Sequence, residues 1–269
     1  MDSNPPASNP HQSVVFGKNP VQVLLEHHPK RVLKVLVSQR ATAHRRIKAL
    51  VDQAKGLGIA TVEAPVHKLE TLVEGQNHQG IVALTRPRDL WSLADLTAYL
   101  DRLPAGKVPL LLALDNITDV HNVGAIIRSA AACGVDAIVL PKMGSGGLSP
   151  VVSKTSAGTD MLVNLVVVPN LANAMKVLKD QGIWWLGTSL GPTSQPYDAY
   201  RDYHYPTGIV MGSEDKGLRP VIEKHCDVLL HIPMAVDVES LNVSVACGII
   251  LFEASRQRRQ LAQTVQPAQ

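Results

Sequence analysis

The chain has 269 residues, of which 45% are hydrophobic but only 4% aromatic, and its formal net charge is +3. This length is comfortable for two domains, and a mostly aliphatic core suits an α/β protein with Val-, Ile- and Leu-rich strands. No run of about 18 apolar residues occurs, which excludes a membrane-spanning helix. Three widely spaced cysteines, Cys133, Cys226 and Cys247, support neither a disulfide framework nor a zinc site. We therefore expect a reduced, cytoplasmic protein without a metal.

The first third of the chain is basic. Residues 1–89 carry 12 Lys/Arg and 7 Asp/Glu, and residues 27–48 carry seven Lys/Arg and no acid. Such a cluster is either a solvated helix face with strand ends, or a phosphate-binding surface on a separate N-terminal module. The length of this stretch without any Asp or Glu favours the phosphate-binding surface. Its candidate contact residues are Lys30, Arg31, Arg40, Arg45 and Arg46.

The N-terminal region is predicted to form a small α/β module over residues 13–88, after a polar, Pro-rich tail at 1–12 that we expect to be disordered. Residues 89–108 are predicted to connect two domains through one helix, at about 92–103, followed by a Pro/Gly break. The elements expected within the module are helices at 18–28 and 43–57 and strands at 32–37, 59–63 and 81–84.

Strands and helices alternate from residue 109 to residue 262, before a short tail at 263–269. This alternation predicts a parallel sheet covered by helices on both faces, which binds ligands at the carboxyl ends of its strands. The expected strands are 110–114, 136–140, 162–168, 183–189, 208–212 and the end of 225–234; the expected helices are 122–134, about 150–157, 170–181 and 242–260.

Three loops at strand ends carry the candidate site. In the first, Asn122 stands at a helix start, where it is either an N-cap or a functional side chain. Arg128 lies on an otherwise apolar helix and needs a carboxylate, a phosphate or water, unless it extends to the surface. In the second, Gly212 to Gly217 permits a tight turn that contains Glu214. The third follows Pro233, and its Ser240 and Asn242 are placed to cap the final helix.

Together these loops resemble the motifs of the SpoU, or TrmH, family of RNA 2′-O-ribose methyltransferases. The motifs read DNITDVHNVGAIIRSA from Asp115, GSEDKG from Gly212, and IPMAVDVESLNVSVACG from Ile232. The resemblance continues through FGKNPVQVLLE from Phe16 and GIWWLGTS from Gly182, so it covers nearly the whole chain apart from its two ends.

The resemblance implies a SPOUT-type domain with a trefoil knot near the C-terminus, an N-terminal RNA-binding module similar to ribosomal protein L30e, and a homodimer with each active site near its interface. It implies S-adenosyl-L-methionine as the cofactor and a guanosine ribose in the peptidyl-transferase loop of 23S rRNA, free or in a pre-50S particle, as the substrate. The family's cofactor contacts correspond here to Thr188, Gly212, Ile232, Met234 and Leu241, and its catalytic residues to Asn122, Arg128, Glu214, Ser240 and Asn242.

The implied reaction is attack of a ribose 2′-oxygen on an activated methyl group, so positioning of the two reactants dominates catalysis. Arg128 would act as a base with a lowered pKa or, as we prefer, would hold a phosphate and stabilise the developing oxyanion. A tRNA methyltransferase and a non-catalytic rRNA-binding relative remain as alternatives. A Rossmann oxidoreductase is disfavoured because no GxGxxG string occurs.

Overall fold

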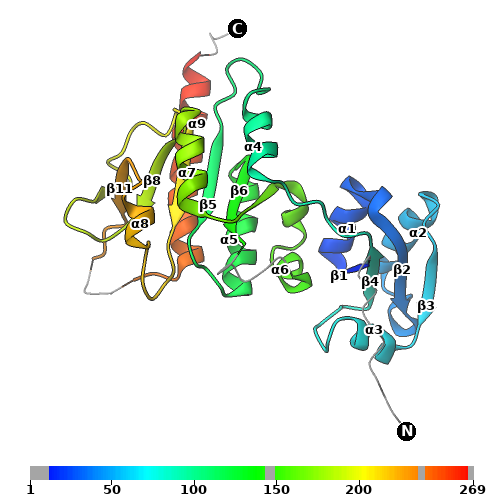
Figure 1. The fold of residues 1–269 in the computed structure, drawn as a ribbon. Coiled ribbons are helices and arrows are strands. Elements are labelled where there is room, and N and C mark those ends of the chain that lie inside the picture. The colour runs from blue at the N-terminus through cyan, green and yellow to red at the C-terminus, as the bar shows by residue number, and fades with distance from the viewer. Residues whose placement is uncertain (1–11, 143–148, 236–239, 266–269) are drawn as a thin grey trace. The chain divides into compact units, whose positions relative to one another are not determined.

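The computed structural model describes residues 12–142, 149–235 and 240–265. It divides into two compact units, one formed by Met1–Asp89 with Pro150–Leu162 and the other by Leu90–Ser149 with Val163–Gln269 (Figure 1). We expected residues 1–12 to be disordered. Residues 1–11 of this segment lie outside the described residues. Each unit has its own sheet and its own apolar core.

The first unit is built on a four-stranded sheet in the order β1-β4-β2-β3. Strand β4 runs antiparallel to β1 and β2, whereas β2 and β3 are parallel. Successive side chains of a strand point to opposite faces, so β2 buries Val35 and Val37 against one set of helices and Leu36 against another. The strands are β1 (Ser13–Phe16), β2 (Val32–Ser38), β3 (Thr61–Ala64) and β4 (Ile81–Thr85).

Helices α1 (Lys18–His27) and α2 (Arg45–Gly56) cover the face that contains Val35 and Val37, and α3 (Val66–Leu72) covers the other. Two 3-10 turns, η1 (Pro29–Arg31) and η2 (Gln39–Ala41), flank β2. Among the basic residues between 27 and 48, Lys34 lies within β2, and the others lie near its two ends and in the first turn of α2.

A segment from the second half of the chain completes this first unit, which the expected domain boundaries did not include. Helix α6 (Pro150–Thr155) and the turn η3 (Thr159–Leu162) lie between two strands of the second unit in sequence. They nevertheless group with the first unit, where α6 packs on β1 and η3 on α1. The physical reason is Met161, which is buried in the core of the N-terminal module. The predicted division at residues 88 and 109 is wrong at this point.

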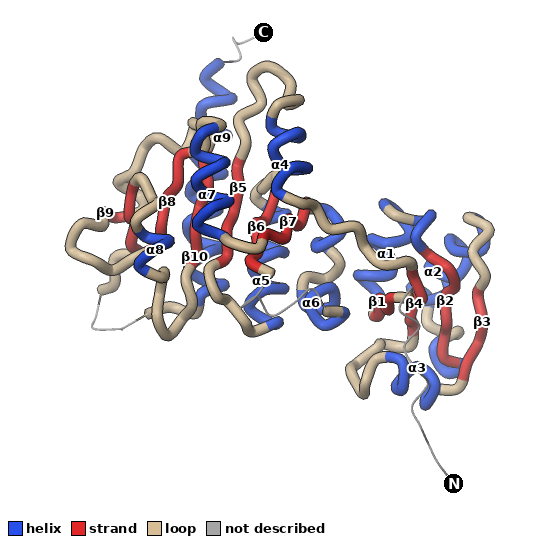
Figure 2. The backbone as a smooth tube through the Cα atoms, in the orientation of Figure 1, coloured by secondary structure: helices blue, strands red, loops and turns tan. Residues whose placement is uncertain are grey.

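The second unit, whose strands are drawn in red in Figure 2, contains a seven-stranded sheet in the order β7-β6-β5-β10-β8-β11-β9. Every neighbouring pair of strands is parallel. The predicted parallel α/β architecture is thus confirmed. The strands are β5 (Leu110–Leu114), β6 (Ala137–Pro141), β7 (Asn164–Val168), β8 (Trp184–Thr188), β9 (Gln195–Pro196), β10 (Thr207–Met211) and β11 (Val228–His231).

Helices cover both faces of this sheet. Helices α4 (Leu93–Leu100), α7 (Leu171–Asp180) and α8 (Pro220–Glu223) share one apolar cluster with the strands. Helices α5 (Val120–Ala132) and α9 (Val243–Val265) pack against each other on the opposite face (Figure 1). Within the described residues, no helix is both long and apolar enough to cross a membrane.

Residues 89–108 do not form a free connection between domains. The backbone N–H of Trp91 donates to the carbonyl of Leu165 on β7, and Leu96 on α4 is fully buried. Ser92 and Asp95 close a capping box that starts α4. The segment therefore belongs to the second unit from residue 90 onward. Helix α9 also continues to Val265, beyond the limit of 262 that we expected for the domain.

Candidate active site

A pocket of about 450 Å³ opens at the carboxyl edge of the large sheet, within the size range of small-molecule sites. It forms there because β10, β8 and β11 are neighbours in the sheet and parallel strands end on the same side. Its walls are the loops that follow these three strands together with the start of α9. Apolar side chains, among them Leu230, Leu241 and Ile250, supply much of the lining.

All five residues predicted to contact a cofactor line this pocket. Thr188 ends β8, Gly212 follows β10, Ile232 and Met234 follow β11, and Leu241 precedes α9. The Thr188 hydroxyl donates to the carbonyl of Val210 at 3.2 Å, which fixes the end of β8 against β10. The structure therefore brings together residues that are up to 53 positions apart in the sequence; their role as cofactor contacts stays a prediction.

The loop after β10 folds back on itself at the pocket wall. The backbone N–H of Ser213 donates to the carbonyl of Gly217 at 3.1 Å, and that of Gly217 to the carbonyl of Ser213 at 2.9 Å. A Cβ at Gly212 would lie 2.2 Å from the carbonyl carbon of Gly217, so a side chain there would open the loop. Gly217 has φ +61°, a left-handed conformation that glycine adopts without steric cost. The two glycines thus hold the backbone close enough to line the pocket.

Asn122, Glu214 and Asn242 form a hydrogen-bonded cluster beside the pocket. Asn242 Nδ2 donates to Glu214 Oε1 at 2.5 Å and to Asn122 Oδ1 at 3.0 Å. Asn122 Nδ2 also reaches Glu214 Oε1, at 3.3 Å. The three predicted catalytic loops are therefore joined directly, and one carboxylate oxygen receives donors from both asparagines.

Glu214 and Asn242 also begin the last helix. The backbone N–H of Val243 donates to Glu214 Oε1 at 3.0 Å, and that of Ser244 to Asn242 Oδ1 at 3.0 Å. A carboxylate at a helix N-terminus is favourable because the unpaired N–H groups and the helix dipole attract negative charge. The predicted cap at Asn242 is confirmed. For Ser240, the described contacts place it in the pocket wall.

Asn122 is not the N-cap of α5. Asp119 occupies that position, and its carboxylate accepts from the backbone N–H of His121 at 3.0 Å. Asn122 lies one turn further on, so its side chain is available for the cluster with Glu214. The capping interpretation of Asn122 is therefore wrong, and its catalytic role stays a prediction.

Arg128 is separate from this cluster. It lies on α5 with an exposed side chain, and within the described residues it makes no ion pair or hydrogen bond and does not line the pocket. Ser129, the next residue, lies beneath α9, where its Oγ would be 3.8 Å from a Cβ on Gly248. The chain alone thus brings four of the five predicted catalytic residues to the pocket or its edge and leaves Arg128 on the surface beside α9.

Glu223 and His231 of the pocket wall were not among the predicted site residues. Glu223 Oε1 accepts from Ser189 Oγ at 3.1 Å, and His231 Nδ1 lies 2.9 Å from Ser194 Oγ. Both pairs tie the loop after β8 to the wall. His231 ends β11, and its place at a strand end is the sequence signal that could have identified it.

The predicted phosphate-binding residues have different surroundings. Lys30, Arg40 and Arg45 are exposed. Arg46 is exposed too, but its Nη2 donates to Asn19 Oδ1 at 2.6 Å and to Gln22 Oε1 at 2.9 Å, which ties α2 to α1.

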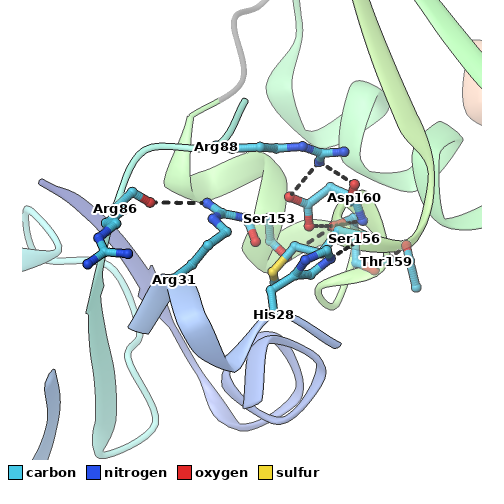
Figure 3. Close-up of polar contacts among 9 residues, drawn as sticks. His28, Arg31, Arg86, Arg88, Ser153, Ser156, Thr159 and Asp160 are labelled. Atoms are coloured by element: carbon cyan, nitrogen blue, oxygen red, sulfur yellow. Dashed lines mark hydrogen bonds and ion pairs between the residues drawn. The ribbon is translucent and has the colours of Figure 1, made fainter. Parts of the chain in front are cut away.

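Arg31 is half-buried, in contrast to the other four. Figure 3 shows its guanidinium beside Ser153 of the α6 segment, and its Nη2 donates to the carbonyl of Arg86 at 3.3 Å. Burial lowers the pKa of Arg31, and the charges of Asp160 and Asp89 oppose that shift. Arg31 is thus engaged within its own unit, whereas the exposed residues remain available to a ligand. Among the described residues, no group of three or more His, Cys, Asp and Glu side chains is arranged to hold a metal ion.

A parallel sheet with a pocket and a polar cluster at the carboxyl ends of its strands defines a ligand-binding α/β enzyme domain. Here it carries a separate small α/β module. The chain belongs to the SpoU rRNA methylase family, whose model matches residues 109–252. A second model, for RNA 2′-O ribose methyltransferase substrate binding, matches residues 14–91.

Relatives of known function match almost the whole chain. The 23S rRNA (guanosine-2′-O-)-methyltransferase RlmB of Pseudomonas putida is 40% identical over 245 residues, which cover 91% of this chain and 96% of that protein. RlmB of Shewanella oneidensis is 41% identical over 248 residues, which cover 92% and 98%. The SpoU methyltransferase AviRb of Streptomyces viridochromogenes, solved in complex with AdoMet, shares the fold with a TM-score of 0.73 at 24% identity; the match covers 93% of this chain and 92% of AviRb.

Proposed function

We propose that this protein transfers the methyl group of S-adenosylmethionine to the ribose 2′-oxygen of a guanosine in 23S rRNA. Two observations support this activity: the pocket beside the Asn122–Glu214–Asn242 cluster, and about 40% identity to RlmB proteins over nine tenths of the chain. The observation that carries it is the cluster, because it assembles three loops of the family motif next to a pocket of suitable size.

The pocket residues fit S-adenosylmethionine. The aliphatic side chains of Leu230, Leu241 and Ile250 offer an apolar surface to an adenine ring, and the closed loop at Gly212 lets backbone groups approach a ligand. The bound cofactor supplies a methyl group that is already activated as a sulfonium. The protein must therefore align the 2′-hydroxyl with that group, keep water out and accommodate the proton that the hydroxyl loses.

The polar cluster serves positioning in this proposal. Both Nδ2 hydrogens of Asn242 are engaged, one with Glu214 and one with Asn122, and its Oδ1 accepts from the Ser244 hydroxyl and backbone. Glu214 Oε1 already receives three donors. These hydrogen bonds hold the start of α9 and of α5 in place around the reacting hydroxyl.

Arg128 holds the phosphate next to the target ribose and stabilises the developing oxyanion; on physical grounds we prefer this role to that of a base. Its isolation within one chain is explained if the protein is a homodimer. Val245 and Phe252, seven residues apart on α9, are 51% exposed each, and this spacing puts them on one face of the helix. A second copy that covers this apolar face of α9 would bring Arg128 from the adjoining α5 to the edge of the partner's pocket.

The expected RNA is ribosomal rather than transfer RNA. The match to the A. aeolicus TrmH/SpoU tRNA modifying enzyme has 31% identity and a TM-score of 0.54, and it covers only 64% of this chain but 89% of that one. The RlmB proteins, in contrast, match over 91–92% of the chain. The additional module, which matches the substrate-binding model, therefore favours an rRNA target, free or within a pre-50S particle in the cytoplasm.

Two finer features of the fold are part of the same proposal. The SpoU membership and the insertion of β10 between β5 and β8 support a C-terminal trefoil knot. The three-layered first unit, with helices on both faces of a mixed sheet, supports an L30e-like module.

The test is transfer of labelled methyl from S-adenosylmethionine to unmodified 23S rRNA and, separately, to unmodified tRNA, followed by mapping of the modified ribose. The expected result is one labelled guanosine ribose in 23S rRNA, absent with the Asn242→Ala variant. Labelling of tRNA alone would overturn the target but keep the chemistry. Cofactor binding without transfer to free RNA would direct the test to pre-50S particles, and absence of cofactor binding would restore the non-catalytic alternative.

A further inference from the structure

The segment Pro150–Leu162 is firmly attached to the N-terminal module, although it lies inside the stretch that matches the methylase model. Figure 3 shows how: Arg88 reaches Asp160, with Nη1 3.6 Å from Oδ2, and Ser156 Oγ donates to the same carboxylate at 3.0 Å. His28 Nε2 lies 2.8 Å from the carbonyl oxygen of Met161. The segment is therefore packed into the module, and Ser156, Asp160 and Met161 are buried there.

The backbone contact is equally close. Gly158 has φ +88°, and a Cβ at this position would lie 2.7 Å from Cα of Pro20 on α1. Only a glycine allows the two backbones to approach to this extent. The position of α6 relative to the start of α1 is consequently defined by packing, and with it the position of Lys154.

Lys154 extends from α6 to the turn between β1 and α1. Its Nζ lies 2.2 Å from the place that a Cβ of Gly17 would occupy, and 5.9 Å from the centre of the Phe16 ring. Gly17 is buried and Lys154 is half-buried. A glycine at position 17 thus provides the space in which this ammonium group rests.

The ammonium group has no counter-charge there. Lys154 makes no ion pair or hydrogen bond with any of the described residues, and burial, followed by the charge of Lys18, lowers its pKa. Lys18 Nζ in turn lies 3.1 Å from Nε2 of His44. Burial and the charge of Lys154 lower the pKa of His78 as well, while Glu70 on α3 opposes this shift. Lys154 on α6, Lys18 on α1, His44 before α2 and His78 before β4 are therefore grouped cationic or potentially cationic side chains, and Glu70 acts on His78.

We propose that Lys154 and Lys18 bind one phosphodiester group of the RNA, with His44 and His78 at the rim of the site. Two half-buried ammonium groups repel each other and have lost part of their hydration, so an anion between them removes both costs. A phosphodiester offers two oxygens that share one negative charge, one for each lysine. This inference rests on the proposed function, and it extends the RNA-binding surface beyond residues 14–91 to a residue of the methylase segment.

The experiment measures RNA affinity as a function of salt. Wild-type protein, Lys154→Met, Lys18→Met and the double variant are titrated between 50 and 200 mM salt with a 23S rRNA transcript that contains the peptidyl-transferase loop and with an unrelated RNA of equal length. Methionine keeps the unbranched apolar stem and removes the charge. Lys176→Met, on the exposed surface of α7, is the matched control for the loss of one positive charge.

We expect each single variant to weaken binding roughly 5- to 10-fold at 50 mM salt and to reduce the slope of log affinity against log salt by about 0.7 to 0.9, the value for one phosphate contact. The double variant should lose less than the product of the single losses, because both lysines serve one phosphate. S-adenosylmethionine affinity should not change, and the melting temperature should not fall, because each variant removes a poorly hydrated charge.

A Lys154→Met slope equal to that of Lys176→Met, with wild-type binding intact, would overturn the proposed site and leave the proposed function untouched. Wild-type binding to both RNAs with equal affinity, together with a reduced slope for Lys154→Met, would support the site and count against the 23S target. If neither RNA binds the wild-type protein, both proposals fail. If millimolar inorganic phosphate competes with RNA for the wild-type protein but not for Lys154→Met, the site takes free phosphate rather than RNA.

Discussion

Asn242 Nδ2 donates to Oδ1 of Asn122 across 3.0 Å, although 120 residues of chain separate the two asparagines. The contact joins the start of α9 to the first turn of α5. Glu214, from the loop after β10, accepts from both. Removal of any one member should therefore loosen two loops that do not contain it.

Glu214→Ala should reduce methyl transfer by a factor of roughly 10 to 100, because Asn122, Asn242 and the first N–H of α9 lose a shared acceptor. The carboxylate is exposed, so we expect a stability loss of only about 1 kcal/mol, as for removal of a helix cap. Single-turnover kinetics and thermal unfolding separate the two effects. Asp215→Ala, next to it in the same loop, is the control and should be nearly neutral. Equal losses for the two variants would contradict a specific role for Glu214.

Gly212→Ala should abolish tight cofactor binding, because the new methyl group would overlap the backbone of Gly217. We expect the S-adenosylmethionine affinity to fall by more than about 10-fold, since the folded-back loop forms the pocket wall. Gly217→Ala is the matched change: no atom lies within 4 Å of its Cβ position, but its φ of +61° is strained for alanine by about 1 kcal/mol. It should lower the melting temperature and largely preserve binding. Calorimetric titration of both variants measures the difference, and equal affinity losses would exclude the steric explanation.

Mixed dimers should reveal whether Arg128 acts across the interface. In a purified heterodimer of Arg128→Ala and Asn242→Ala subunits, action in trans leaves one intact site and one site with both substitutions. Such a heterodimer should retain about half the wild-type turnover, whereas each homodimeric variant should be almost inactive. A heterodimer as inactive as its parents would place Arg128 in the site of its own chain.

Two serines of the α6 segment should differ in their contribution to stability. Ser156 is fully buried, and its Oγ donates to Asp160 and to the carbonyl of Ser153. Ser156→Ala removes a donor from a buried carboxylate, which should cost about 1 to 3 kcal/mol of unfolding free energy. Ser153 Oγ is buried without a hydrogen-bond partner among the described residues. Ser153→Ala should therefore be neutral to within about 0.5 kcal/mol. Urea unfolding measures both, and a larger loss for Ser153→Ala would contradict the described contacts.

The three cysteines should resist alkylation in the native protein. Burial raises the pKa of the Cys133 thiol to about 11 and that of Cys226 to about 12, and it raises the pKa of the fully buried Cys247 as well. The reactive thiolate is thus scarce at neutral pH. Mass spectrometry after iodoacetamide treatment at pH 7.5 should find little modification, and complete modification in 6 M guanidinium chloride. Rapid labelling of Cys226 in the native state would show that the α8 region opens.

The parts of the fold that the sequence predicts well are those with strong local patterns. The apolar run LLLAL is strand β5 at Leu110–Leu114, and the run around Ile209 is β10. The pocket residues were predicted through the family motifs; their local pattern alone is ordinary. Asn122 shows where local sequence patterns fail to predict the structure. Asp119, three residues earlier, can also cap α5, and only the structure shows that Asp119 is the N-cap.

The packing between segments that are far apart in the chain could not be predicted from the sequence. Nothing in PVVSKTSAGTDML indicates that Met161 is buried beside Val21 and Leu25 rather than in the neighbouring sheet. The same holds for α4, whose Pro/Gly-rich flank resembles a linker although Leu96 is fully buried. Periodicity tells which face of a helix is apolar, but it does not tell which core receives that face.

The position of Met161 also affects how the protein folds while it is being synthesised on the ribosome. Residues 13–89 emerge first, but the core that they form includes a side chain that is translated 72 residues after Asp89. At bacterial elongation rates this interval is roughly 4 to 15 s. During that time the nascent module exposes the apolar surface of α1 and β1 that α6 and η3 later cover. A chain truncated before residue 150 would therefore carry an N-terminal module whose apolar flank stays exposed, and this flank would favour association with chaperones or with other nascent chains.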